Sequence, residues 1–192
     1  MRIIGGKVKG RRLQTPPRIM TKTPGLLIRP TADRAREALF SIIGGKVQGA
    51  AVLDLYAGTG ALGLEALSRG AELAVFVDNS TRAVQIINKN IGLCGFYDKT
   101  FLFKRDLSKG LSFLTKGLPE TTFSVVFVDP PYRQDFSGFM LQELAKSSLL
   151  GPKALVVIEE DAFEELPAQA GILTLIDQRR YGETGFWFYR RD

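Results

Sequence analysis

The stretch Ala51-Val52-Leu53-Asp54-Leu55-Tyr56-Ala57-Gly58-Thr59-Gly60-Ala61-Leu62-Gly63 decides the fold class. Its first five residues are mostly apolar and predict a buried strand, and glycines spaced as G-x-G-x-x-G follow. A turn of this kind joins a parallel strand to a helix and lets the backbone approach a ligand closely. The spacing suits NAD, FAD or S-adenosylmethionine (SAM). A tight turn that needs glycine only for its geometry is the alternative without a ligand.

Strand-like and helix-like segments alternate on both sides of this stretch. We expect strands at 51–55, 73–77, 100–104, 124–128 and 154–158, and a hairpin at 172–179 and 185–190. Helices are expected at 32–43 (capped by Thr31), 81–93, 107–115, 136–148 and 161–166, and the range 58–68 is expected to be a glycine-rich turn followed by a helix. Repeated βα units predict an α/β, Rossmann-like fold. Its sheet would be mostly parallel and seven-stranded, with an antiparallel strand from the C-terminal hairpin. The aromatic run 186–189 fits a strand buried on both faces better than a platform for bases.

Composition narrows the classes of chemistry. The chain has 192 residues, 45% of them apolar and 24% charged, as in soluble globular proteins. No apolar stretch approaches the ~20 residues of a membrane span, and the N-terminus lacks the apolar core of a signal peptide. We expect the single cysteine, Cys94, to be a packed residue. These features predict a cytoplasmic protein, which we expect to be a monomer. The chain contains no histidine, which excludes Ser-His and Cys-His catalysis and histidine metal sites.

The positive charge is concentrated at the N-terminus. Residues 1–46 carry 11 Lys/Arg and 2 Asp/Glu, whereas residues 47–192 carry 15 and 18. We therefore divide the chain into a basic RNA-binding extension (1–30, a hairpin and a proline-rich loop) and a catalytic domain (31–192). A merely solvated basic surface is the alternative, and Arg34 could instead pair with Glu37 on one helix face. The expected RNA contacts are Arg2, Lys7, Lys9, Arg11, Arg12, Arg18, Arg29, Arg34 and Arg36.

Acidic residues lie at the ends of three neighbouring predicted strands: Asp54 within 51–55, Asp78 at the end of 73–77 and Asp106 just past 100–104. Asp54 would face a pyrophosphate unfavourably but suits the ammonium of an amino acid; Asp78 suits ribose hydroxyls and Asp106 an adenine amino group. SAM carries all three groups, although any one acid could be a surface residue or a helix cap. The expected cofactor contacts are Asp54, Tyr56, Ala57, Gly58, Thr59, Gly60, Asp78, Asn79, Asp106 and Leu107. No metal is expected.

A stiff turn, Asp129-Pro130-Pro131-Tyr132, follows the strand 124–128. Two consecutive prolines restrict the backbone and remove two N–H donors, so a carboxylate, a carbonyl and an aromatic ring are held close together. This tetrad suits a planar NH₂ group on a base, and we predict that its four residues form the catalytic site. A rigid turn without chemistry is the alternative.

Several segments resemble a known family. Residues 51–132 resemble a class I SAM-dependent methyltransferase, and the tetrad resembles the (D/N)PP(Y/F/W) motif of amino-group N-methyltransferases. The wider chain is similar to the RsmD family of 16S rRNA (guanine-N2)-methyltransferases, through residues 2–7, 10–13, 29–40, 52–66 and 180–184. It departs from that pattern at Gly6, at Ser41 and in the longer, proline-rich segment 15–28, which puts the detailed RNA contacts in doubt.

The resemblance implies methyl transfer from SAM to a guanine N2 in small-subunit ribosomal RNA, free or in an assembling subunit. Asp129 and Pro130 would hold the amine and Tyr132 would stack on the base. Adenine N6, cytosine N4 and glutamine N5 amines suit a similar tetrad, so the base stays open from the residues alone. An NAD-dependent oxidoreductase and a non-catalytic RNA-binding module are the further alternatives.

Overall fold

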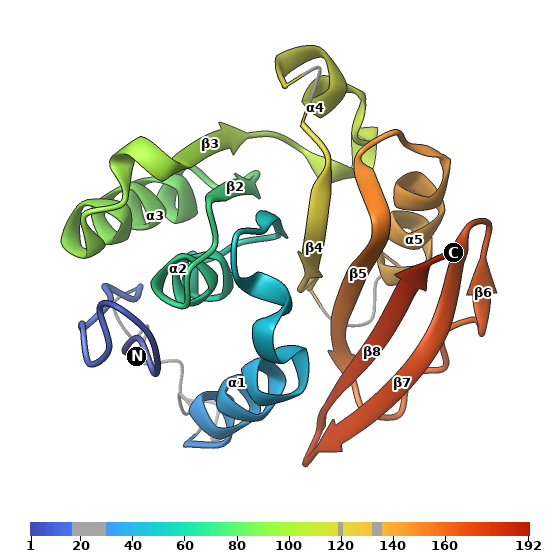
Figure 1. Cartoon of the computed structure of the whole chain (residues 1–192), viewed down its shortest axis with the longest axis horizontal. Helices are drawn as coiled ribbons and strands as arrows, with labels where there is room; N and C mark the ends of the chain where they lie inside the picture. The colour runs from blue at the N-terminus through green and yellow to red at the C-terminus, as the bar shows by residue number, and fades with distance from the viewer. Residues whose placement is uncertain (17–29, 119–120, 132–135) are drawn as a thin grey trace, which may run out of the picture.

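An eight-stranded sheet, in the order β3-β2-β1-β4-β5-β8-β7-β6, forms the centre of the molecule (Figure 1). The structure is a computed structural model that describes residues 1–16, 30–118, 121–131 and 136–192. Five strands are parallel: β1 (Ala51–Leu55), β2 (Leu73–Asp78), β3 (Thr100–Lys104), β4 (Phe123–Val128) and β5 (Leu150–Asp161). Three are antiparallel: β6 (Gln169–Ala170), β7 (Leu173–Tyr181) and β8 (Thr184–Arg191). The predicted Rossmann-like fold is confirmed.

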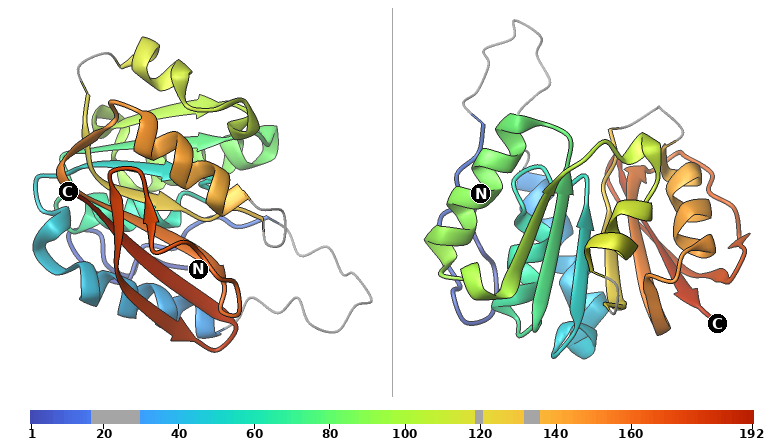
Figure 2. Two further views of the ribbon diagram at one scale, coloured as in Figure 1. Left: turned by 90° about the vertical axis from the view of Figure 1, so that its right-hand side faces the viewer. Right: turned by 90° about the horizontal axis from the view of Figure 1, so that it is seen from above.

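Helices cover both faces of the sheet (Figures 1 and 2). One face packs against α1 (Pro30–Ile43), α2 (Ala61–Ser68) and α3 (Thr81–Cys94), and the other against α4 (Ser112–Gly117) and α5 (Phe136–Lys146). Short 3-10 turns lie at Gly44–Val47, Tyr97–Lys99 and Leu107–Lys109. Apolar residues alternate between the two faces along each strand, which produces two separate cores. Within the described ranges, every helix is too short or too polar to cross a lipid bilayer.

The aromatic run on β8 is a core element, as predicted. Phe186, Trp187, Phe188 and Tyr189 are each at most 2% exposed, because β8 lies between β5 and β7 and contributes to a core on each of its two faces. Cys94 is likewise packed in the core beneath α3.

Several boundary predictions were wrong for identifiable reasons. The predicted helix at 161–166 does not form, since antiparallel pairing with β8 extends β5 as far as Asp161, opposite Thr184. Helix α1 begins at Pro30, a residue whose fixed φ suits the first helical position, so Thr31 is not its cap. The predicted helix 107–115 is split by Gly110, whose φ is +79°. The two-residue β6 raises the strand number from seven to eight.

The N-terminal segment packs onto α2. Its described part, residues 1–16, contains one antiparallel bridge, between Arg2 and Arg12, rather than regular strands. The buried carboxylate of Glu65 accepts hydrogen bonds from the N–H groups of Ile4 (2.7 Å) and Gly5 (2.8 Å). A Cβ on Gly6 would stand 1.9 Å from the Ser68 carbonyl oxygen, so only glycine allows this approach. Backbone contacts with α2 therefore fix the position of the segment that carries the basic residues.

Candidate active site

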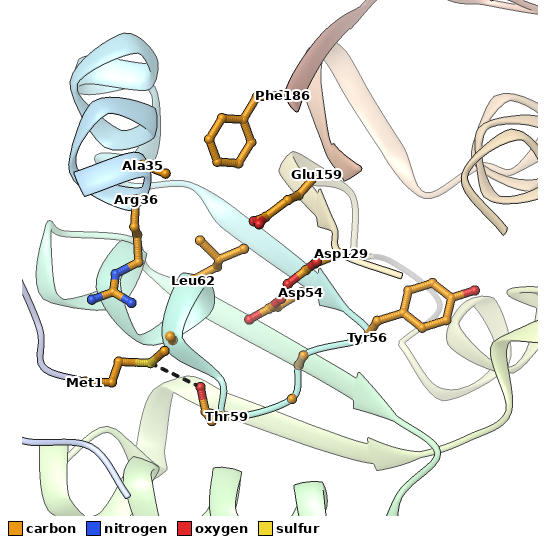
Figure 3. Close-up of a pocket in the computed structure, with 13 residues that line it drawn as sticks. Met1, Ala35, Arg36, Asp54, Tyr56, Thr59, Leu62, Asp129, Glu159 and Phe186 are labelled. Carbon is orange, nitrogen blue, oxygen red and sulfur yellow. Dashed lines mark hydrogen bonds between the residues drawn. The ribbon is translucent and has the colours of Figure 1, made fainter. Parts of the chain in front are cut away.

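Two cavities open at the carboxyl edge of the parallel strands and share Tyr56 and Asp129. The β2-side cavity, of about 400 Å³, lies over the ends of β2 and β3. The β5-side cavity, of about 280 Å³, lies between β1, β4, β5 and α1 (Figure 3). Ligands of open α/β sheets bind at this edge. Of the predicted cofactor residues, Tyr56, Asp78, Asn79, Asp106 and Leu107 line the first cavity, and Asp54, Tyr56, Ala57, Gly58 and Thr59 line the second.

The glycine turn is held by the acids that the sequence placed beside it. The N–H of Gly58 donates to Asp78 Oδ2 (2.9 Å), and the N–H of Gly63 donates to Asp54 Oδ2 (2.9 Å). Gly58 and Gly60 have φ values of +56° and +75°, which favour glycine. Gly60 itself lines neither cavity; it is the N-cap residue of α2 and lies against the side chain of Ile87.

Asp54 is the most deeply buried acid of the site. It is 1% exposed, and its Oδ1 has no hydrogen-bond partner among the described residues. Burial raises the pKa of Asp54 to about 7; the Gly63 hydrogen bond opposes this rise and the charge of Asp78 adds to it. An unpartnered buried oxygen destabilises the ligand-free fold. A ligand that brings a donor, above all a cation, would satisfy it.

Asp78 and Asp106 line the β2-side cavity and also organise their own loops. Asp78 accepts from the N–H groups of Gly58 and Ser80. Asp106 caps the 3-10 turn that follows it, accepting from the Ser108 hydroxyl (2.7 Å) and N–H (3.1 Å), and these bonds lower its pKa. Asp106 is therefore ionised at neutral pH. Carboxylate oxygens can accept further bonds, so both residues remain suited to bind hydroxyl or amino groups.

Asp129 stands between the two cavities. Its N–H donates to the carbonyl of Leu55 (3.3 Å), which ties the start of the tetrad to β1. Loss of hydration raises the pKa of Asp129 well above its usual range, and the charges of Glu159, Asp54 and Glu160 raise it further. Pro130 and Pro131 line the β2-side cavity, Pro130 buried and Pro131 exposed. Tyr132 lies outside the described residues.

Tyr56 also separates the cavities, and its backbone is unusual. Its φ is +58°, a conformation uncommon for residues other than glycine, and such strain is concentrated at functional sites. Its ring lies 6.0 Å from that of Phe136 at the start of α5. Burial and the charge of Asp106 raise the pKa of Tyr56 to about 12, so the phenol stays neutral.

Sequence reasoning missed several residues of the β5-side cavity, chiefly Glu159, Phe186, Leu62 and Met1. Glu159 follows the apolar run of β5 as Asp129 follows that of β4, so the same pattern of an acid at a strand end could have identified it. Met1 accepts a hydrogen bond at Sδ from the Thr59 hydroxyl (3.5 Å), and this contact had no sequence signal. The described residues hold no cluster of three potential metal ligands.

The predicted RNA contacts are divided between surface and interior. Arg2, Lys7, Lys9, Arg11, Arg12 and Arg34 are exposed. Arg36 is only 6% exposed; its Nη2 donates to the Arg2 carbonyl (2.7 Å), and it lines the β5-side cavity. The helix turns the Arg36 side chain toward the core and the cavity rather than toward the exposed surface, and its expected contact with RNA stays a prediction. Arg18 and Arg29 lie outside the described residues.

Comparison with known proteins gives matches over the whole chain. The model of a family described as conserved hypothetical protein 95 matches residues 1–190. The ribosomal RNA small subunit methyltransferase D of Escherichia coli K12 is 35% identical, with 100% of this chain and 90% of that protein covered. YlbH of Bacillus subtilis is 34% identical, with 100% and 99% covered. The structure of the Escherichia coli protein yhhF superposes with a TM-score of 0.82 at 31% identity, covering 100% of this chain and 98% of that one.

Proposed function

The chain belongs to the conserved hypothetical protein 95 family and is a methyltransferase, and from this premise we propose that it methylates the exocyclic N2 amine of a guanine in small-subunit ribosomal RNA with SAM as donor. Family membership decides against an NAD-dependent oxidoreductase and a non-catalytic binding module. The named activity of the Escherichia coli relative, 35% identical over this whole chain, supports the RNA substrate. The observation that carries the proposal is the position of Asp129, which lines both cavities.

The residues around the two cavities fit SAM. Asp54, with its unpartnered buried Oδ1, would bind the ammonium of the donor's amino-acid part. Asp78 would accept from the ribose hydroxyls, and Asp106 would accept from the adenine amino group in the β2-side cavity. Ala57, Gly58 and Thr59 of the glycine turn line the β5-side cavity, so the part of the ligand that joins these groups would lie against this backbone. SAM supplies a methyl group on a sulfonium, whose sulfur leaves with the bonding electron pair.

Positioning is then the main task of the protein. The lone pair of a guanine amine is delocalised into the ring, so the nitrogen is a poor nucleophile. The carboxylate of Asp129 and the carbonyl of Pro130 each accept one N–H, which orients the lone pair toward the methyl group. When the N–C bond has formed, the nitrogen bears a positive charge and one proton must leave. Asp129, whose pKa is raised by its buried surroundings, is suited to accept that proton.

The test is Asp129→Ala with tritiated SAM and ribosomal RNA from a strain that lacks the enzyme. Because the side chain acts on the amine and not on the donor, we expect methyl transfer to fall by about 10³-fold or more while SAM affinity stays within a few-fold. Nucleoside mass spectrometry of the wild-type product should show N2-methylguanosine.

A matched control is Asp98→Ala. Asp98 is an exposed acid in the 3-10 turn before β3, at the opposite end of the sheet from the cavities, and its removal should leave turnover unchanged. Near-normal turnover of Asp129→Ala would remove the catalytic assignment. Methylation of a base other than guanine would leave the catalytic role of the tetrad standing and refute the choice of base.

A further inference from the structure

We propose that Glu159 selects guanine by accepting the N1–H of the base whose N2 amine is held by Asp129. This inference rests on the proposed guanine-N2 transfer and adds the residue that would read the base. The sequence motif contains no such residue, because Glu159 comes from the next strand of the sheet.

Strand register places Glu159 beside Asp129. Val128 pairs with Ile158 in the parallel β4–β5 ladder, so Asp129 and Glu159 occupy equivalent positions just beyond it, on strands ~4.8 Å apart. The side chains of Phe127 and Val157, two residues earlier, belong to the core beneath α1–α3. Since side chains alternate along a strand, Asp129 and Glu159 project on this same side. In Figure 3 both carboxylates lie in the β5-side cavity, close to Asp54.

The remaining walls of this cavity suit a flat apolar ligand with donors on one edge. Phe186 on β8 pairs with Glu159 in the antiparallel register and forms an aromatic wall. Leu62 of α2 and Ala35 of α1 add apolar surface. The buried Oδ1 of Asp54, assigned above to the ammonium of SAM, lines the same cavity, so the methyl donor would lie next to the base.

The pattern of donors on guanine matches two adjacent carboxylates. On guanine, the N2 amine is adjacent to N1–H, so both groups donate. On adenine, the N6 amine is adjacent to N1, and on cytosine the N4 amine is adjacent to N3; both of these ring nitrogens carry lone pairs. A carboxylate facing such a lone pair is repelled and left unsatisfied, and sites built on buried hydrogen bonds discriminate strongly for that reason. Glu159 thus distinguishes guanine from adenine and cytosine, whose amines also suit the tetrad.

The experiment compares two RNA substrates that differ only at the target nucleotide, which product mapping identifies. One substrate carries guanine; the other carries 2-aminopurine, which keeps the N2 amine but has a lone pair at N1. We expect wild-type enzyme to prefer guanine by about 10²-fold or more. In Glu159→Gln the amide can donate to N1, so the preference should fall by about 10-fold or more. Stabilisation by S-adenosylhomocysteine in thermal unfolding shows that the variant is folded.

Two further variants test whether the effect depends on the position of the substitution and on the length of the side chain. Glu165→Gln makes the same change at an exposed position and should leave the preference unaltered. Glu159→Asp keeps the carboxylate but places it farther from the base, because the side chain is shorter. Turnover of the guanine substrate should therefore fall, with no gain on the 2-aminopurine substrate. Equal turnover of both substrates by wild-type enzyme, or an equal loss on both in Glu159→Gln, overturns the role of Glu159 while guanine-N2 transfer stands. A wild-type enzyme that does not methylate guanine N2 instead refutes the proposed function.

Discussion

Asp54, which we propose binds the ammonium of the methyl donor, reduces the stability of the fold when no ligand is bound. Its carboxyl is buried with one oxygen unpartnered, and its pKa is raised from 3.8 to about 7. In the unfolded chain the same group ionises near its ordinary pKa. The folded state therefore binds more protons between those values, and the free energy of unfolding falls as pH rises from about 4 to about 7. The ammonium of a bound ligand would offset this loss of stability, because it pairs with the ionised carboxylate.

Asp54→Asn should therefore stabilise the ligand-free protein. The amide oxygen can still accept from Gly63, and no charge is buried. At about pH 8 we expect unfolding to require about 1–3 kcal/mol more free energy than in the wild type, a rise in Tm of several degrees. At about pH 4.5 the difference should nearly vanish, since Asp54 is then protonated in the folded wild type. Thermal unfolding with and without SAM measures both effects.

The same variant should lose most of its stabilisation by SAM. An Asp54→Asn variant that is less stable than wild type at pH 8, or that keeps full SAM affinity, would contradict the role of Asp54 as the ammonium ligand. Asp98→Asn, an exposed change of the same kind, serves as the reference for both measurements.

At the scale of single residues, sequence predicts best where an acid lies at the carboxyl end of a strand. Asp54, Asp78, Asp106 and Asp129 were all named from that pattern, and all line the two cavities. Glu159 has the same pattern and could have been named from it, but its place beside Asp129 depends on the pairing of β4 with β5 rather than on local sequence. The burial of Arg36 was not predicted either, because it depends on how the helix is turned toward the core.

At the scale of elements, helix α2 holds two other parts of the molecule in place. Its N-terminal end packs against β2 behind the glycine turn, and its C-terminal half holds residues 1–16 through Glu65 and Ser68. A Cβ on Gly63 would lie 2.4 Å from the ring of Phe76 and 3.2 Å from Asp54 Oδ2. The third glycine of the motif is therefore required by helix–strand packing and by the position of Asp54.

Gly63→Ala should weaken both folding and SAM binding. Phe76 is fully buried and has little room to move, so we expect a destabilisation of about 1–3 kcal/mol in denaturant unfolding. Displacement of Asp54 should also weaken SAM binding, measured by calorimetry. Gly45→Ala is the matched control, because a Cβ at that position meets nothing within 4 Å. Equal stability of the two variants would show that α2 can shift without cost.

Element boundaries were predictable where local pattern decides them. Strands β1 and β3 have the predicted limits, and β2 and β4 extend by one residue. The errors occur where pairing is non-local. The segment 159–161 becomes strand because β8, more than twenty residues later, pairs with it, and β6 exists only through its contact with β7. No window of sequence around either segment contains that information.

At the scale of the whole molecule, the N-terminal segment connects the exposed basic residues to the edge of the sheet where the two cavities open. Asn90 of α3 is buried and links the two parts: it accepts from the Gln14 N–H (2.7 Å) and donates to the carbonyls of Gln14 (3.0 Å) and Thr59 (2.9 Å). Thr59 belongs to the glycine turn and Gln14 follows Arg11 and Arg12. The residues expected to contact phosphates are thus held at a fixed distance from the cavities.

The last prediction concerns this basic surface. Replacing Arg11 and Arg12 with alanine should weaken RNA binding and reduce the slope of log affinity against log salt by ~0.7–0.9 for each phosphate that is no longer bound. Both side chains are exposed, so stability should not change. Lys116→Ala with Lys146→Ala removes the same charge from α4 and α5, on the opposite face of the sheet, and should leave the slope nearly unaltered. Filter binding at several salt concentrations decides between a local contact and a general effect of net charge, because only a local contact predicts different slopes for the two double variants.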